Sequence, residues 1–270
     1  MKGLSRAFPL LFILPALVSL AQIFVPDLGI YHGPRPTAAA TVASLSKIVL
    51  LACCAYFSWS NARALYTADH DISSAWVRLA TGWTLYCMGQ MTLGWYQIVK
   101  GTDAPFPSWA DAFFLLAYPC FLAALLAFLH VYRQAGFGVG TVAQQWALGA
   151  AVGVSCLTVA IPLLRPALAA PTSSTGETAL NLAYPVLDLA LVAPLVLLMR
   201  VAFALRGGSV AGVWAAVLAG FAFMCAGDVL FAHFSALGKV GLDPYVHATY
   251  IVSYGLVAEG ARRQGALAAK

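Results

Sequence analysis

The chain has 270 residues, of which 61% are hydrophobic and 9% are charged, with a net charge of +5 at pH 7. A soluble domain usually carries about 25% charged residues, so this composition excludes a water-soluble globule. The basic residues are scattered singly, which excludes a phosphate-binding stripe and argues against a nucleic-acid partner. Apolar runs of about 18 to 24 residues match the length that a helix needs to cross a bilayer. The predicted fold class is an all-α integral membrane protein.

Eight apolar runs predict eight transmembrane helices in a single transmembrane domain, residues 1–270, with no soluble domain. The runs lie at about 8–25, 40–59, 76–99, 110–132, 145–164, 181–205, 212–235 and 245–261. Segments rich in Pro, Gly, Ser and Thr separate them, as expected of loops. The first run follows a charged start, like a signal peptide. No small-x-small cleavage site closes it, so we interpret it as a retained helix.

The lysines and arginines predict that both termini are cytoplasmic, because cytoplasmic loops of membrane proteins carry more basic residues. With the N-terminus inside, the cytoplasmic segments hold Lys2, Arg6, Arg63, Arg78, Arg133, Arg200, Arg206, Arg262, Arg263 and Lys270. The outer loops hold only Arg35, Lys100, Arg165 and Lys239. This bias predicts a multi-pass protein of the cell inner (plasma) membrane with N-in/C-in topology.

Two parts of the chain resemble each other. The segment GWTLYCMGQMTLGWY and the segment GFAFMCAGDVLFAHF match at positions 138 residues apart, namely Gly82 and Gly220, Cys87 and Cys225, Gly89 and Gly227, and Gln90 and Asp228. Further along, Tyr118 and Tyr254 fall at matching depths, and Tyr184-Pro185 echoes Tyr118-Pro119. The pattern predicts a recurring helical hairpin of about 69 residues, half of that separation.

Polar residues inside the predicted spans are the candidate site. An ionisable side chain at the bilayer centre costs about 2.5–3.5 kcal/mol, so each one requires a role. If their helices meet, Gln90, Asp188 and Asp228 line one polar cavity. The alternative is that they hydrogen-bond each other, or backbone groups freed by prolines, and fix helix register. The predicted ligand-binding residues are Gln90, Asp111, Tyr118, Tyr184, Asp188, Asp228 and Tyr254.

Other motifs are assigned structural roles. The pattern Ser108-x-x-Asp111 predicts a capping box at the start of a helix. Lys47 is expected to extend outward toward the membrane surface; a lysine that holds a chromophore as a Schiff base is the alternative. The histidines and the six cysteines lack metal-ligand spacing, so no metal site is predicted. Motifs for nucleotide or hydrolase chemistry are missing from the sequence, and the residues identify no cofactor.

The string PSWADAFFLLAYPCFLAALL at 107–126 resembles a signature of multi-span bacterial sensory modules. Such modules precede diguanylate cyclase or histidine kinase domains. The similarity continues at 183–198 and 226–263, and covers roughly residues 80–263. It implies ligand binding and signalling. Because no output domain follows before Lys270, we expect signalling to pass through a cytoplasmic or membrane partner.

A second resemblance is to the lysoplasmalogenase family, which also has about eight helices and a Gly-Asp helix in each half. Gly227-Asp228 matches one of these, and Lys47 matches a lysine near the start. The other half carries Gly89-Gln90, which lacks the carboxylate. This resemblance implies a membrane lipid hydrolase, with Asp228 and Asp188 left as the acid and base of a two-carboxylate mechanism.

Three functions are therefore open. The first is a non-enzymatic sensory module that binds an apolar or amphipathic small molecule or lipid. The second is the lipid hydrolase, and the third is a small-molecule transporter that moves protons through the same aspartates. A hydrolase must release product and a transporter must move solute. A sensor need do neither, but its ligand should stabilise it.

Overall fold

The computed structural model describes residues 7–24, 38–102, 104–137, 140–169, 175–204, 209–237 and 243–268. Within these ranges the secondary structure is helical, without a β-strand. Five of the helices are long and apolar enough to cross a membrane. The chain is thus a multi-pass α-helical membrane protein, as its composition predicts. The basic residues Lys2, Arg6, Arg35, Arg206, Lys239 and Lys270 lie outside the described ranges.

The helices overlap the eight predicted runs one for one. In chain order they are α2 (Leu10–Phe24), α3 (Ala38–Leu65), α4 (His70–Gly94), the π-helical segment η2 (Trp95–Lys100), α5 (Trp109–Gln134), α6 (Val142–Ala169), α7 (Thr175–Ala204), α8 (Ser209–Ala236) and α9 (Asp243–Ala268). Several extend past their apolar runs because polar end turns and caps lengthen a helix. At the start of α4, for example, the Asp69 side chain accepts from the backbone N–H groups of Asp71 and Ile72, both at 3.0 Å.

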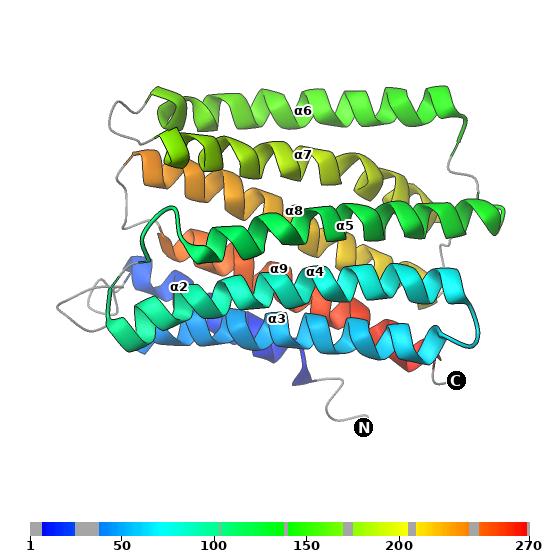
Figure 1. Ribbon diagram of the computed structural model, residues 1–270, viewed down its shortest axis with the longest axis horizontal. Helices are drawn as coiled ribbons and strands as arrows, with labels where there is room; N and C mark the ends of the chain where they lie inside the picture. The colour runs from blue at the N-terminus through cyan, green and yellow to red at the C-terminus, as the bar shows by residue number, and fades with distance from the viewer. Residues whose placement is uncertain are drawn as a thin grey trace.

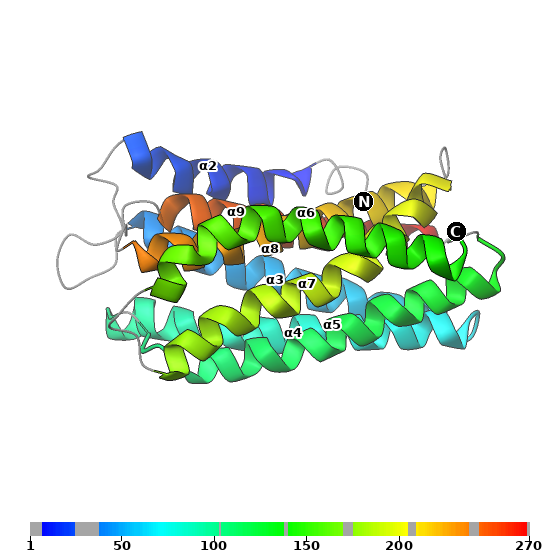
Figure 2. The ribbon, with the colours of Figure 1, turned by 90° about the horizontal axis from the view of Figure 1, so that it is seen from above.

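Two long helices, α4 and α9, are less apolar than the rest, and each packs against at least two other helices. The five membrane-capable helices are α3, α5, α6, α7 and α8. Helix α9 packs against α2, α3 and α8, whereas α4 packs against α3 and α5. In Figure 2, α2 lies on one face, α4 and α5 lie on the opposite face, and α8, α9 and α3 lie between them. A helix side that faces protein can carry polar groups, since other helices there supply hydrogen-bond partners.

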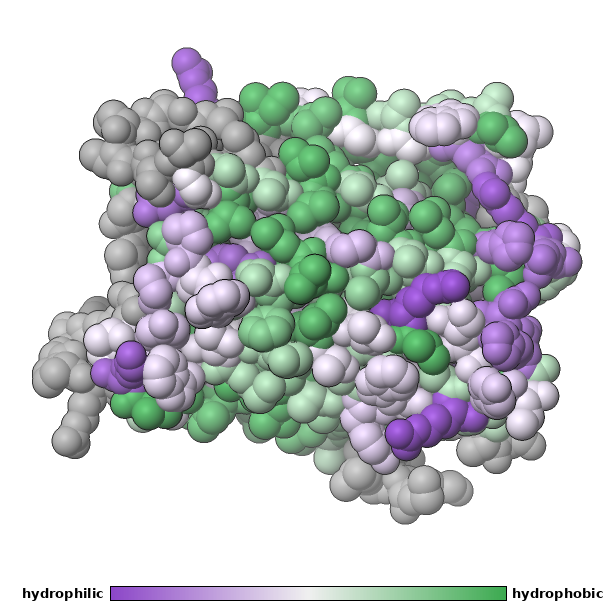
Figure 3. All heavy atoms as spheres, in the orientation of Figure 1, coloured by the Kyte–Doolittle hydropathy of each residue, from purple (hydrophilic) through white to green (hydrophobic). Residues whose placement is uncertain are grey.

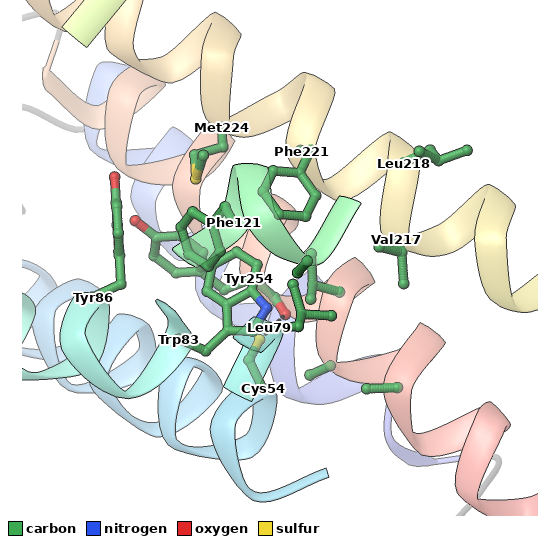
Figure 4. Close-up of a cluster of buried hydrophobic side chains, with 14 of the residues drawn as sticks. Cys54, Leu79, Trp83, Tyr86, Phe121, Val217, Leu218, Phe221, Met224 and Tyr254 are labelled. Carbon is green, nitrogen blue, oxygen red and sulfur yellow. Dashed lines mark hydrogen bonds between the residues drawn. The ribbon is translucent and has the colours of Figure 1, made fainter. Parts of the chain in front are cut away.

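Aromatic side chains form the centre of the bundle. The Trp83 ring of α4 lies 4.5 Å from the Phe121 ring of α5 and 5.3 Å from the Phe221 ring of α8. Tyr254 of α9 and Tyr86 of α4 complete the cluster, with ring centroids 6.0 Å apart (Figure 4). All five are buried. The cluster joins four helices, and its Phe121 ring lies 6.5 Å from the ring of Tyr118.

Two hairpins, α4–α5 and α8–α9, pack through equivalent glycine contacts. In each, two glycines seven residues apart face two residues seven apart on the second helix. A Cβ added at these glycines would lie 2.5 to 2.8 Å from the facing side chain; the pairs are Gly82 with Phe121, Gly89 with Phe114, Gly220 with Val257, and Gly227 with Tyr250. Glycine is needed here because the helices approach closely, as is common between membrane helices.

The outer surface is suited to lipid. Helix α6 lies at the edge of the bundle (Figure 1), and its side chains Trp146 and Val154 are 77% and 64% exposed. Figure 3 shows apolar residues over the middle of one face, and hydrophilic residues gathered at the end where α3 leads into α4. Exposed apolar area on this scale marks an interaction surface, and for helices of this length the partner is the bilayer core.

The close approach of α8 and α9 gives a test of the packing. At Gly220, an added Cβ would meet Val257 at 2.5 Å and the backbone oxygen of Ser253 at 2.8 Å. We expect Gly220→Leu to lower stability by about 1–3 kcal/mol through overpacking. Gly153→Leu in α6 is the control, because nothing lies within 4 Å of its added Cβ. Thermal unfolding in detergent measures both, and equal loss in the two variants would contradict the packing.

Candidate functional site

A tyrosine hydroxyl joins two aspartates in the bundle interior. The Tyr118 hydroxyl of α5 lies 2.9 Å from Asp188 Oδ1 of α7 and 2.9 Å from Asp228 Oδ2 of α8. All three residues are buried, and Tyr118 is 1% exposed. Tyr250 of α9 donates a further hydrogen bond to Asp228 Oδ1. Four helices therefore meet through these four side chains, which we call the Tyr118 network (Tyr118, Asp188, Asp228 and Tyr250).

The helix periodicity brings these groups together. On α5, Asp111, Phe114 and Tyr118 are spaced i, i+3 and i+7 and so share one face. On α9, Tyr250 and Tyr254 are spaced i and i+4, and their rings stack with centroids 6.0 Å apart and planes at 13°. Each network residue thus lies on the inward stripe of its helix, among apolar neighbours.

The hydrogen bonds of the network require one extra proton. A tyrosine hydroxyl has a single hydrogen, so it donates to one neighbour and can only accept from the other. Two ionised carboxylates around Tyr118 would leave one of its contacts without a hydrogen. One carboxyl group must therefore carry a proton. Asp228 faces two hydroxyls, whereas Asp188 faces one hydroxyl and the weaker donor thiol of Cys225. The arrangement therefore fits an ionised Asp228 and a protonated Asp188 that donates to Tyr118.

A second cluster lies nearer the start of α5. The Asp111 Oδ2 atom accepts from the backbone N–H of Ser108 at 2.7 Å, which confirms the predicted capping box. Its Oδ1 atom accepts from the Tyr184 hydroxyl at 2.8 Å. Asp111 therefore caps its own helix and also fastens α7 to it. The rings of Tyr184 and Tyr118 lie 6.2 Å apart, so the two clusters are neighbours.

Gln90 is buried at 3% exposure but does not hydrogen-bond to the aspartates. Its Nε2 atom has no partner among the described residues, and the same holds for Asp188 Oδ2. The contacts of Gly82 with Phe121 and of Gly89 with Phe114 fix the antiparallel register of α4 and α5. That register places Gln90 level with Phe113, between the levels of Asp111 and Tyr118. The amide is thus near the network in depth but separate from it.

The structure brings together most of the predicted site. Asp188, Asp228 and Tyr118 share one network, Asp111 and Tyr184 share the next, and Tyr254 packs beside Tyr250. The hydrogen bonds of the two aspartates run to tyrosine hydroxyls, which neither the predicted cavity nor the predicted bonding to each other or to freed backbone had specified. Tyr250 was not among the predicted site residues, although it lies one turn before Tyr254 on the same face of its helix.

The prediction that the Lys47 side chain extends outward toward the membrane surface is wrong. Lys47 is 4% exposed, and its Nζ atom lies 3.2 Å from Nδ1 of His247. Helix α9 packs over this face of α3, so the lysine is enclosed between the two helices. The described residues contain no group of three or more His, Cys, Asp or Glu side chains that could hold a metal ion.

Comparisons with protein-family models, with curated proteins and with solved structures find no match to this chain.

The bridging hydroxyl gives the first test of the network. Tyr118→Phe leaves two buried carboxyl oxygens without their partner, and we expect a loss of about 1–3 kcal/mol in unfolding free energy. Tyr56→Phe is the matched control, because Tyr56 is 67% exposed and surface changes usually stay within about 0.5 kcal/mol. A Tyr118→Phe protein as stable as this control would show that the bridge does not form.

The proton assignment predicts an asymmetry between the two aspartates. Asparagine at position 188 offers an N–H to Tyr118, as a protonated carboxyl would, so Asp188→Asn should keep most of the stability. Asparagine at position 228 places an N–H where an acceptor is needed, so Asp228→Asn should lose about 1–3 kcal/mol. Unfolding in detergent at neutral pH measures the difference. The reverse order would place the proton on Asp228.

Proposed function

We propose that this protein is a sensory module of the inner membrane that binds an apolar or amphipathic small molecule or lipid beside the Tyr118 network. The observation that carries the proposal is a pair of buried, unpartnered polar atoms, Asp188 Oδ2 and Gln90 Nε2. A buried polar atom without a partner costs about 1–3 kcal/mol. A ligand with both a donor and an acceptor would remove that cost at both atoms.

The topology belongs to the same proposal. All eight helices would cross the membrane, with both termini in the cytoplasm. Helices that follow one another run in opposite directions along the bundle (Figure 1), so the ends that carry Arg63, Arg133 and Arg200 fall on one side. Lys100 lies at the opposite end, over the rings of Trp95 and Tyr96 at 4.6 and 5.5 Å. Such aromatic and basic groups are typical of a membrane boundary.

The chemistry of the site defines a ligand class. Asp188 Oδ2 would accept from a hydroxyl or amine, and Gln90 Nε2 would donate to a carbonyl or ether oxygen. Tyr86 and Phe114, with ring centroids 4.5 Å apart, supply aromatic wall at the same depth. An amphipathic molecule with a small polar head and an apolar body satisfies these groups. Pockets that bind such molecules combine apolar walls with a few polar groups.

Helix α9 offers a route from the site to a partner. It carries Tyr250 in the network and continues as one helix to Ala268. Beyond the apolar part, Glu259 accepts from Arg262 and Arg263, each with a contact of 2.7 Å. A ligand that changes the hydrogen bonds of Asp228 would act on Tyr250 and so on the position of α9. The signalling partner would contact the cytoplasmic end of α9 and respond to its change of position.

A lipid hydrolase is the second candidate, and the paired carboxyls are the observation that favours it. Asp188 and Asp228 touch the same hydroxyl and share one proton in the assignment above. One protonated and one ionised carboxyl are what an acid and base pair requires. We prefer the sensor because tyrosine hydroxyls already engage both carboxyl groups of the network. Only Asp188 Oδ2, of the four carboxyl oxygens, is left without a partner among the described residues and could bind a ligand.

Gln90→Leu tests the binding proposal without breaking a hydrogen bond of the protein, since the amide nitrogen has no partner. We expect the wild type, purified in mild detergent, to retain a ligand as extra mass in native mass spectrometry. Gln90→Leu should fold normally but retain at least about tenfold less of it, the worth of one buried hydrogen bond. Asp188→Asn keeps an acceptor and should retain the ligand, as should the control Met91→Leu.

Two results would contradict the sensor. One is wild-type protein without extra mass that lipid extracts also fail to stabilise, because a bound ligand must raise the unfolding temperature. The other is release of product from lysolipids by the wild type but not by Asp228→Asn, which would support the hydrolase. Solute movement in liposomes that depends on Asp228 would support the transporter.

A further inference from the structure

A groove of about 350 Å³ opens between α4 and α5, and no residue of the Tyr118 network lines it. Its α4 wall is polar and includes Asp71, Ser74 and Arg78. Its α5 wall includes Ala123, Leu126 and His130. The groove lies toward the end of the bundle where hydrophilic residues gather in Figure 3. It faces outward, since Arg78, Leu126 and His130 are all exposed.

The charges in the groove have no partners within the described part of the chain. The ion pairs formed there are those of Glu259, so neither Arg78 nor Asp71 is paired. Arg78 lies eight residues into α4, which is about 12 Å from its start at 1.5 Å per residue. At that depth a guanidinium faces the boundary between headgroups and acyl chains. It needs an anion there, because an unpaired charge close to hydrocarbon is costly.

The order of the groups along the groove matches one kind of molecule. Asp71 lies at the start of α4, near the membrane surface, and Arg78 lies two turns deeper. In a zwitterionic phospholipid the phosphate is deeper than the ammonium, which is the same order with opposite charges. By the register of α4 and α5, Ala123 lies deeper than Arg78, so the apolar part of the groove continues where the acyl chains begin. Ser74 and His130 supply donors between the two charges.

We propose that this groove binds a phospholipid with a phosphate and a primary ammonium, of the phosphatidylethanolamine type. Arg78 holds the phosphate with a charge-assisted hydrogen bond, Asp71 holds the ammonium, and Leu126 and Ala123 contact an acyl chain. Under the orientation proposed above, the lipid comes from the cytoplasmic leaflet. The binding chemistry is independent of the Tyr118 network and of its ligand.

Native mass spectrometry of the purified full chain with added lipid tests the site. Phosphatidylethanolamine should bind the wild type, and Arg78→Gln should reduce the bound fraction about tenfold, the worth of one charge-assisted hydrogen bond. Asp71→Asn should remove the preference for phosphatidylethanolamine over phosphatidylglycerol, because only the former carries the ammonium. Arg63→Gln is the control, since Arg63 is exposed at the same end of the bundle but outside the groove.

Arg78 makes no hydrogen bond or ion pair with described residues, so its replacement should leave the fold intact. Leu126→Trp, which fills the groove without changing charge, is the second variant and should also reduce binding. Equal phosphatidylethanolamine binding by the wild type, Arg78→Gln and Leu126→Trp would overturn the proposal. An equal loss of binding in Arg63→Gln would also overturn the proposal, because the loss of any one positive charge would then explain the result. Binding of glycerophosphoethanolamine as tight as that of the lipid would show that the acyl contact is absent.

Discussion

The hydrogen bonds of one hydroxyl, that of Tyr118, hold the interior of this membrane protein together. In a membrane the hydrophobic effect does not drive helices against each other, since lipid is as apolar as their side chains. Specific contacts must do so instead. Tyr118 supplies them by joining α5 to α7 and α8 at 2.9 Å on both sides, and Tyr250 adds α9 through Asp228. A buried network of this kind stabilises the interior through its satisfied hydrogen bonds, although Asp188 Oδ2 has no partner among the described residues.

The glycine contacts explain how the network is positioned. In α4–α5 and in α8–α9, glycines seven residues apart let the second helix approach closely. The same geometry brings Tyr118 and Tyr254 to equivalent places in their hairpins. Gln90 and Asp228 are likewise equivalent, but only Asp228 is hydrogen-bonded to tyrosine. The two similar hairpins therefore differ in this position: tyrosines engage Asp228 in one, whereas the amide nitrogen of Gln90 in the other has no partner among the described residues.

Much of the fold follows from the sequence, because apolar runs of membrane length are a strong signal. The apolar pattern misplaced the ends: α4 starts at His70 rather than near residue 76, because Asp69 caps it. Asp188 and Asp228 stood out as charges within apolar runs. Their shared partner could not be predicted, because no periodicity reveals which faces of α5, α7 and α8 meet. Lys47 was misjudged for the same reason: its neighbour His247 is 200 positions away.

The most direct test is a double-mutant cycle between Tyr118 and Asp228, measured by reversible unfolding in mixed micelles. Tyr118→Phe, Asp228→Asn and the double variant give the coupling energy of the two side chains. The network predicts a coupling of about 1 kcal/mol or more, whereas Tyr118→Phe combined with the exposed Tyr56→Phe should be additive. If the losses from Tyr118→Phe and Asp228→Asn add within about 0.5 kcal/mol in the double variant, the two groups do not interact. That result would contradict a Tyr118 network in the interior.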